Sequence, residues 1–293
     1  MSTSATQTGS VVAAAIQEIN HIATLPEVTL RIVELVEDPS STAQDLQRMI
    51  SNDPALCSRI LKVVNSAFYG LPGQVASIDR AIVLLGLNAV KNIAVAASLS
   101  KLYRGGQLTP HFAARDLWVH SIATAATAKV VADTVGLGLP DEAFLGGLVH
   151  DIGVMVEMQA ERDKLVQILE SLDVDGDGAP QKPMLDAEER VLHATHQDYG
   201  RGICEKWKFP KSFQYICGWH HNPLELAEAN RTLACVVHIA DRLTAKHNMG
   251  FRLDVSDTSV AKDILDAVKL STAQLEELSS SLPEKVEGVE RLL

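Results

Sequence analysis

The hydrophobic positions of this chain recur mainly at intervals of three and four residues, which is the period of an amphipathic helix. Between residues 28 and 36, for example, apolar side chains stand at Val28, Ile32, Leu35 and Val36. Convincing stretches that alternate between apolar and polar residues, as a half-buried strand would, are absent. The pattern therefore predicts an all-α fold of roughly a dozen helices.

Capping and breaking residues set the expected ends of these helices. Ser41 with Gln44 fits a capping box, and Asp53 before Pro54 fits an N-cap with proline at the first helical position. Ser77 fits a further N-cap. The helices expected in chain order are Val11–Ala23, Glu27–Glu37, Ser41–Ile50, Pro54–Val64, Ile78–Leu85, Asn88–Tyr103, His111–Val135, Asp141–Asp151, one ending near Leu172, Leu185–Ala194, His196–Trp207, Lys211–Trp219, Arg231–Lys246, Thr258–Leu270 and Ser271–Leu293.

Two glycine-rich loops interrupt the helical pattern. The loop Arg104–Pro110, with its adjacent glycines, suggests a boundary between two helical subdomains. We accordingly divide the chain into an N-terminal extension (1–24), an N-terminal helical subdomain (25–104), a second helical subdomain (105–250) and C-terminal helices (251–293). The acidic loop 173–178 is similar to the start of a calcium loop, but Met184 stands where an EF-hand needs glutamate. A solvated loop is the better interpretation.

Composition places the chain among ordinary globular proteins. Of 293 residues, 46% are hydrophobic and 22% charged, enough for a substantial core. The net charge of -11 disfavours nucleic acid as a partner. We find no signal peptide and no apolar run of roughly 20 residues, so we expect a cytoplasmic protein without a membrane partner. The four scattered cysteines fit reduced thiols in the core.

The most distinctive chemistry lies in Gly146-Gly147-Leu148-Val149-His150-Asp151-Ile152-Gly153. An imidazole nitrogen beside a carboxylate suits a divalent transition metal. Two ligands do not complete a site, so other side chains would have to converge on this pair. The candidates are His120 upstream and His196, His220, His221 and Asp241 downstream.

From about Leu25 to Lys246 the chain resembles the HDOD domain, the HD-related output domain of bacterial signalling proteins. The order of the motifs over some 220 residues carries the resemblance, since each is weak alone. The motifs are Leu25-Pro26, Ser51-Asn52-Asp53-Pro54-Ala55-Leu56, Val64-Asn65-Ser66-Ala67, Ile78-Asp79-Arg80-Ala81-Ile82, Leu84-Leu85-Gly86, Leu117-Trp118-Val119-His120-Ser121, Gly147-Leu148-Val149-His150-Asp151-Ile152-Gly153, Trp219-His220-His221-Asn222-Pro223 and His238-Ile239-Ala240-Asp241.

The resemblance implies an HD-like helical core preceded by an N-terminal helical subdomain, and a role in bacterial signalling. It also implies one or two ions of iron, manganese, zinc, nickel or magnesium. The implied ligands are His120, His150, Asp151 and Asp241 for a first ion and His196, His220 and His221 for a second. Asp198 or His238 would orient ligands, whereas we expect His193 to lie outside the site.

Two departures from the related HD-GYP phosphodiesterases argue against their chemistry. Those enzymes carry lysine after the glycine of the HD motif, where this chain has Val154. Their Gly-Tyr-Pro element is also missing, because Asn222-Pro223-Leu224 follows the paired histidines. The histidines and aspartates would then be either a metal site without turnover or polar groups that bond to one another in the core.

Three functions follow from the sequence. The leading hypothesis is a non-catalytic regulatory module that acts through a protein partner, or by sensing a metal, nucleotide or phosphate ligand. The alternative is a metal-dependent phosphohydrolase or phosphodiesterase. The third is a nucleic-acid-associated regulator, because the two short helices of Thr42–Asn65 resemble a helix-turn-helix. Whether the chain forms a homodimer stays open.

Overall fold

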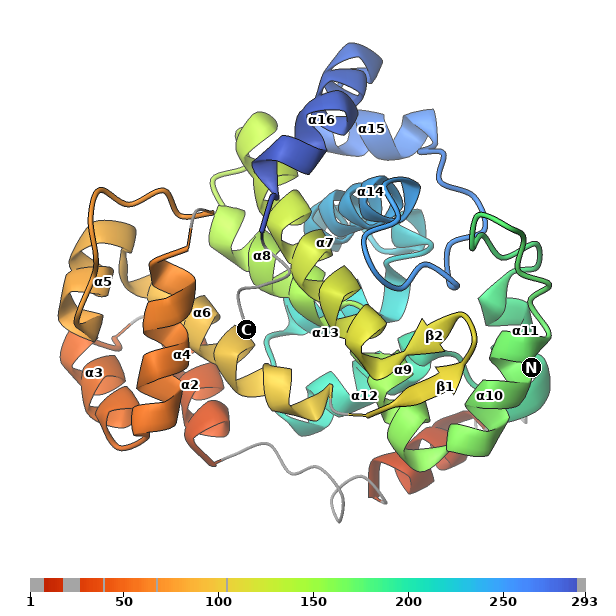
Figure 1. Ribbon diagram of the computed structural model, residues 1–293, viewed down its shortest axis with the longest axis horizontal. Helices are drawn as coiled ribbons and strands as arrows, with labels where there is room; N and C mark the ends of the chain where they lie inside the picture. Colours follow the sequence, from red (N-terminus) through yellow and green to blue (C-terminus); the bar gives the residue numbers. More distant parts are fainter. Residues whose placement is uncertain (1–7, 18–26, 39, 67, 104, 289–293) are drawn as a thin grey trace.

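The computed structural model describes residues 8–17, 27–38, 40–66, 68–103 and 105–288. Within these ranges the fold is helical apart from one short hairpin, which confirms the predicted all-α class (Figure 1). Residues 8–17 form a first helix. The next elements are α2 (Glu27–Glu37), α3 (Ala43–Ser51), α4 (Pro54–Val64), α5 (Ile78–Leu85), α6 (Leu87–Leu99) and the 3₁₀ turn η1 (Ser100–Leu102).

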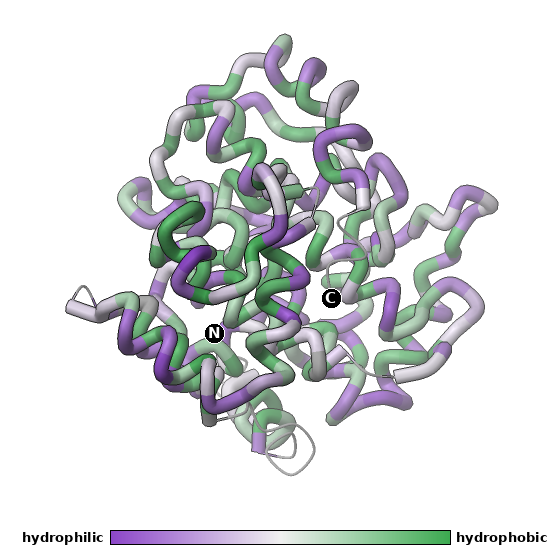
Figure 2. Tube along the Cα trace, turned by 60° about the vertical axis from the view of Figure 1, so that its left-hand side comes forward, coloured by the Kyte–Doolittle hydropathy of each residue, from purple (hydrophilic) through white to green (hydrophobic). Residues whose placement is uncertain are grey.

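After these come β1 (Gln107–Thr109), β2 (Phe112–Ala113), α7 (Ala114–Thr134), α8 (Pro140–Val149), α9 (Ile152–Ala160), α10 (Arg162–Glu170), α11 (Met184–Leu192), α12 (His196–Lys206), α13 (Lys211–Trp219), η2 (Pro223–Glu225), η3 (Glu228–Asn230), α14 (Thr232–Lys246), α15 (Lys262–Val268) and α16 (Thr272–Lys285). Hydrophobic and hydrophilic segments both occur in the helices (Figure 2), while α6, α8 and α9 are buried along almost their whole length.

Helices α2 to α5 lie together at one end of the molecule, and α6 leads from them into the rest (Figure 1). The predicted caps of α4 and α5 are confirmed, since Asp53 and Ser77 each accept a backbone N–H bond from the first turn. The predicted capping box of α3 is wrong by one residue. Thr42 caps this helix together with Asp45, while the Ser41 hydroxyl accepts a hydrogen bond from the buried Lys91.

The long helix expected from His111 instead begins at Ala114, because residues 107–113 form the β1–β2 hairpin. Asp116 bonds the backbone N–H of Ala113 and so stabilises this later start. The alanine-rich part of α7 allows a close approach by α8. A Cβ on Gly147 of α8 would lie 2.7 Å from the Thr124 carbonyl oxygen. Helices α7, α8 and α14 thus form the packed centre of the larger part (Figure 1).

Other expectations have mixed outcomes. The acidic loop forms hydrogen bonds within itself, since the Asp175 carboxylate accepts from the backbone N–H groups of Asp177 and Ala179. All four cysteines are free, although Cys57 is only half-buried. The predicted end of the first helix at Ala23 lies outside the described residues. So do the predicted boundary between residues 24 and 25 and residue 104 at the second predicted boundary. No helix in the described ranges is long and apolar enough to cross a membrane.

Candidate metal centre

Seven candidate ligands, distant in the sequence, lie around one point in the larger part of the fold. They are His120 in α7, His150 and Asp151 between α8 and α9, His196 at the start of α12, His220 and His221 after α13, and Asp241 in α14. Six of these residues are inaccessible to solvent, and His221 is only 9% exposed. The structure therefore brings together every residue that the sequence singled out for the two ions.

The junction between α8 and α9 directs Asp151 into this centre. Asp151 is the N-cap residue of α9, yet its carboxylate makes no capping hydrogen bond. Since aspartate at this position normally caps its own helix, the side chain is committed elsewhere. Two residues later, a Cβ on Gly153 would lie 1.8 Å from the His196 carbonyl oxygen. Only glycine permits this approach of α9 to α12, and the approach places His196 beside Asp151.

The first group of ligands, here called half-site A, consists of His120, His150 and Asp241. The Nε2 atoms of the two histidines lie 3.2 Å apart, and Asp241 Oδ1 lies 3.2 Å from His120 Nε2. Asp151 Oδ2 completes the group, 3.3 Å from His150 Nε2 and 3.6 Å from His120 Nε2. Two imidazoles and two carboxylates thus point at one small volume.

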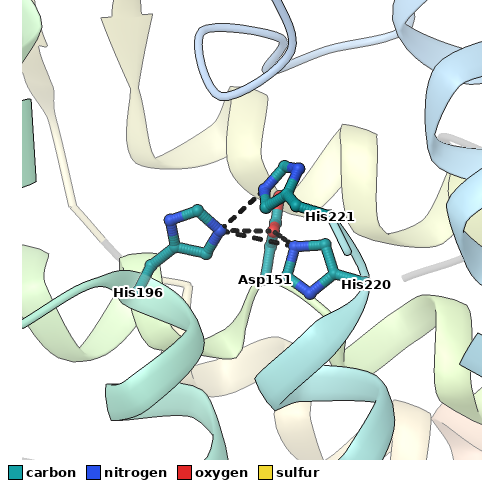
Figure 3. Close-up of side chains that lie close together, drawn as sticks. All are labelled: Asp151, His196, His220 and His221. Atoms are coloured by element: carbon teal, nitrogen blue, oxygen red, sulfur yellow. Dashed lines mark hydrogen bonds and ion pairs between the residues drawn. The ribbon is translucent and has the colours of Figure 1, made fainter. Parts of the chain in front are cut away.

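The second group, half-site B, consists of His196, His220 and His221, and Figure 3 shows their side chains facing Asp151. His196 Nε2 lies 3.3 Å from His220 Nε2 and 3.0 Å from His221 Nε2. Asp151 Oδ1 lies 3.3 Å from His220 Nε2 and 3.8 Å from His196 Nε2. The two oxygens of Asp151 therefore face different half-sites.

These separations also suit nitrogens that share one ion. Nitrogens about 2.1 Å from one metal lie about 3.0 Å apart at right angles and about 3.4 Å apart in a tetrahedron. The nitrogen–nitrogen separations of 3.0 to 3.3 Å fall within that interval. The Nδ1 atoms of His150 and His220 contact helix carbonyl oxygens, to which they can donate, and this leaves their Nε2 lone pairs facing inward.

The carboxylates of the centre supply a second test of the fit. Both oxygens of Asp151 and both of Asp241 are buried without a hydrogen-bond partner. An unsatisfied buried polar group costs about 1–3 kcal/mol, and more when it is charged. Ions held by the two half-sites would give these oxygens their missing partners. The residues present therefore fit divalent metal ions.

The electrostatic character of the two half-sites differs. Burial lowers the pKa of His150, but the carboxylates of Asp151 and Asp241 outweigh it and raise the pKa to about 9. Burial also lowers the pKa of His220 in half-site B. Burial and the adjacent imidazoles hold the pKa of His221 well below its usual value. The carboxylates thus favour positive charge at His150, whereas burial disfavours it at His220 and His221. His196 in half-site B differs from these two, because the Glu188 carboxylate outweighs burial and raises its pKa.

Outer contacts hold the ligands in place, and sequence reasoning missed the most important one. Glu188 of α11 accepts hydrogen bonds from the backbone N–H of His196 and from its Nδ1. Such a carboxylate fixes the tautomer of a ligand histidine. His238, one of the two residues that we expected to orient ligands, contacts the backbone carbonyl oxygen of His220 through Nδ1 at 2.7 Å.

Asp198, the second residue that we expected to orient ligands, instead stabilises the start of a helix. Its carboxylate accepts hydrogen bonds from the backbone and hydroxyl of Thr195 at the start of α12. His193 lies outside both half-sites, as expected, in a left-handed conformation at the end of α11. A third group combines His221 and Asp241 with Asp254, which the sequence analysis did not identify. No motif surrounds Glu188 or Asp254, so neither carried a recognisable signal.

Comparisons with known proteins agree with this architecture. A family model for the HDOD domain matches residues 22–223. The crystal structure of an HDOD domain protein of unknown function from Geobacter sulfurreducens superimposes with a TM-score of 0.80 at 22% identity, over 96% of this chain and 97% of that chain. The crystal structure of a candidate phosphohydrolase from Shewanella amazonensis SB2B superimposes with a TM-score of 0.72 at 24% identity, over 96% of each chain.

A candidate signal transduction protein from Marinobacter aquaeolei VT8 gives a TM-score of 0.74 at 21% identity, over 92% of this chain and 59% of that chain. At these identities the solved structures support the fold alone. An uncharacterized protein of Treponema pallidum (strain Nichols) is 25% identical over 237 residues, which are 80% of this chain and 44% of that protein. The chain thus spans less than half the length of this relative.

Proposed function

This chain belongs to the HDOD domain family, and from that premise we propose that it is a bacterial regulatory module whose HD-like core binds two divalent metal ions. His120, His150, Asp241 and one oxygen of Asp151 would hold the ion of half-site A. His196, His220, His221 and the other oxygen of Asp151 would hold the ion of half-site B. Bound there, such ions would supply fixed positive charge and Lewis acidity.

One observation carries this proposal. The carboxylate of Asp151 is buried and has no hydrogen-bond partner, and each of its oxygens faces a different set of imidazole nitrogens. A core that merely bonded its own polar groups would satisfy these oxygens with donors. Bridging two cations is the arrangement that compensates both oxygens at once.

A regulatory role fits the enclosure of the centre better than turnover does. His221 is the most exposed of the seven ligands, and it is 9% exposed. A substrate ester needs a path to the ions and open positions on them. Val154, in the position where related phosphodiesterases carry lysine, is fully buried and has no charge to offer a phosphate. Ion binding would then set the conformation that a signalling partner recognises.

A metal-dependent phosphohydrolase remains the second candidate, because two half-sites that share a carboxylate suit phosphate-ester hydrolysis. Solved structures of this fold include both a candidate signal transduction protein and a candidate phosphohydrolase. The two candidates agree on the metal centre and differ only in turnover. One pair of measurements therefore separates them.

The first measurement is metal content by inductively coupled plasma mass spectrometry, after growth with iron, manganese, zinc and nickel. We expect two ions per chain in the wild type and a loss of both in Asp151→Ala, because that carboxylate would serve both half-sites. The matched control is Asp177→Ala, which removes an exposed carboxylate from the acidic loop and should keep every ion.

The second measurement is turnover of a cyclic dinucleotide and of a phosphomonoester by the loaded protein. We expect none. Turnover that Asp151→Ala abolishes and Asp177→Ala preserves would establish the phosphohydrolase instead. A wild-type protein that binds no ion from any of the supplemented metals would contradict both candidates and leave the cluster as polar core.

A further inference from the structure

The segment between α14 and α15 carries a carboxylate that neither half-site includes. Asp254 has a fully buried side chain, and both of its carboxylate oxygens lack a hydrogen-bond partner. Among the described residues, the ion-pair partner found for this carboxylate is His221, whose Nε2 lies 3.6 Å from Asp254 Oδ2. A buried carboxylate without donors is costly unless a cation compensates it.

Asp254 points into the metal centre. Ligand atoms of Asp254, His221 and Asp241 all lie within 4.8 Å of one another. His221 Nε2 also lies 3.0 Å from His196 Nε2, inside half-site B. Because one imidazole lone pair serves one ion, Asp254 and His196 would share the ion that His221 binds. Ligand atoms about 2.1 Å from one ion lie about 3.0 to 3.6 Å apart for angles of 90 to 120°, which includes the separation of 3.6 Å between Asp254 and His221.

Tight packing on α7 fixes the segment that presents Asp254. The backbone N–H of Phe251 donates to the Asp116 carbonyl oxygen at 2.9 Å. At Gly250, where φ is +86°, a Cβ would lie 2.5 Å from that oxygen and from the His120 backbone nitrogen. The Phe251 ring lies 6.2 Å from the His120 ring, in an edge-on orientation. The segment thus covers a ligand of half-site A while Asp254 reaches half-site B.

We propose that Asp254 is a ligand of the ion at half-site B, through which the segment 249–257 closes the metal centre against external anions. This inference rests on the proposed metal binding and goes beyond it. Asp151 and the three histidines supply four ligands, so Asp254 takes a fifth position. Sites that hydrolyse esters keep such a position open for water or substrate. The same contact ties the start of the C-terminal helices α15 and α16 to the ion.

Cobalt(II) is the probe for this proposal, because its visible absorption reports the number and type of ligands. Wild type, Asp254→Asn and Asp257→Asn are each chelated and then titrated with cobalt. Asp257 is the matched control, since it lies in the same segment but is exposed and accepts hydrogen bonds only from Ser259. Inorganic phosphate is then added to each loaded protein.

We expect Asp254→Asn to bind the second cobalt ion at least about tenfold more weakly, by analogy with losses in metal-site shells. Phosphate should change the spectrum of this variant and leave wild type and Asp257→Asn unchanged. Identical cobalt affinity and spectra in Asp254→Asn and wild type would overturn this inference alone. A wild type whose spectrum responds to phosphate as strongly as the variant would do the same. A wild type that binds no cobalt would overturn the proposed metal binding as well.

The chelated proteins supply the folding reference. Asp254→Asn replaces a buried carboxyl group that accepts no hydrogen bond among the described residues with an amide of the same shape, so its melting temperature without metal should equal or exceed that of the wild type. A lower value would mean that the carboxylate serves the fold itself, and would overturn the proposal.

Discussion

Half-sites A and B meet at Asp151, but their other ligands differ in charge and in what orients them. Half-site A adds the carboxylate of Asp241, and its neighbouring carboxylates raise the pKa of His150 to about 9. Half-site B offers three imidazoles, and Glu188 orients the first of them. If both half-sites bind ions as proposed, charge would dominate binding at A, whereas at B the placement of the imidazoles would matter more.

The largest effect should come from removing one ligand of each half-site in turn. Asp241→Asn removes the charge of a carboxylate that faces His120 and His150, so we expect the ion at half-site A to bind about 100-fold more weakly. His221→Gln should weaken the ion at half-site B and spare the ion at half-site A. Calorimetric titration of chelated protein with zinc measures both affinities. If each variant lost both ions together, the half-sites would be one cooperative site, and the contrast between A and B would fail.

A second substitution tests whether B depends on orientation. In Glu188→Ala the acceptor of the His196 Nδ1–H hydrogen bond is lost, whereas in Glu188→Gln an amide oxygen can still accept it without a charge. If orientation matters, we expect about a 10- to 100-fold loss of affinity for the ion at B in Glu188→Ala, a smaller loss in Glu188→Gln, and no change at A in either variant. Glu189→Gln, on the exposed next residue, is the control. An effect on A equal to that on B would show that Glu188 acts through overall charge.

The smallest effect is expected at Asp198, which caps α12 without facing either ion. Asp198→Ala should lower the free energy of unfolding by about 1 kcal/mol, the usual cost of a lost cap. Urea denaturation of the chelated protein measures this change, and mass spectrometry should find the metal content unaltered. Loss of the ion at B would mean instead that the start of α12, and with it His196, depends on this cap.

Helix caps were predicted correctly from the sequence where the capping interaction joins residues close together in the chain. The caps Asp53 and Ser77 bond to N–H groups three residues away, so their pattern is visible in the sequence. The cap predicted at Ser41 was wrong because the prediction used local spacing alone. Ser41 and Gln44 have the spacing of a capping box. The Ser41 hydroxyl instead bonds Lys91, which lies 50 residues away, and the next residue caps the helix.

Contacts between residues distant in the sequence were likewise not predictable at the candidate metal centre. Residue type and motif order alone selected the seven side chains that the fold brings together, because imidazole and carboxylate groups are common metal ligands in any fold. The position of Asp151 between both half-sites depends on the close approach of α9 to α12 at Gly153. Glu188 and Asp254 stand in no motif and were found only through their contacts.

The sequence by itself therefore determined the helical class, several helix ends and the chemistry available for binding metal. The tertiary structure decided which oxygen faces which imidazole, what orients His196 and which segment covers the centre. Helical period and capping act within a few residues. Contacts between distant helices depend on packing of the whole core, which no local pattern records.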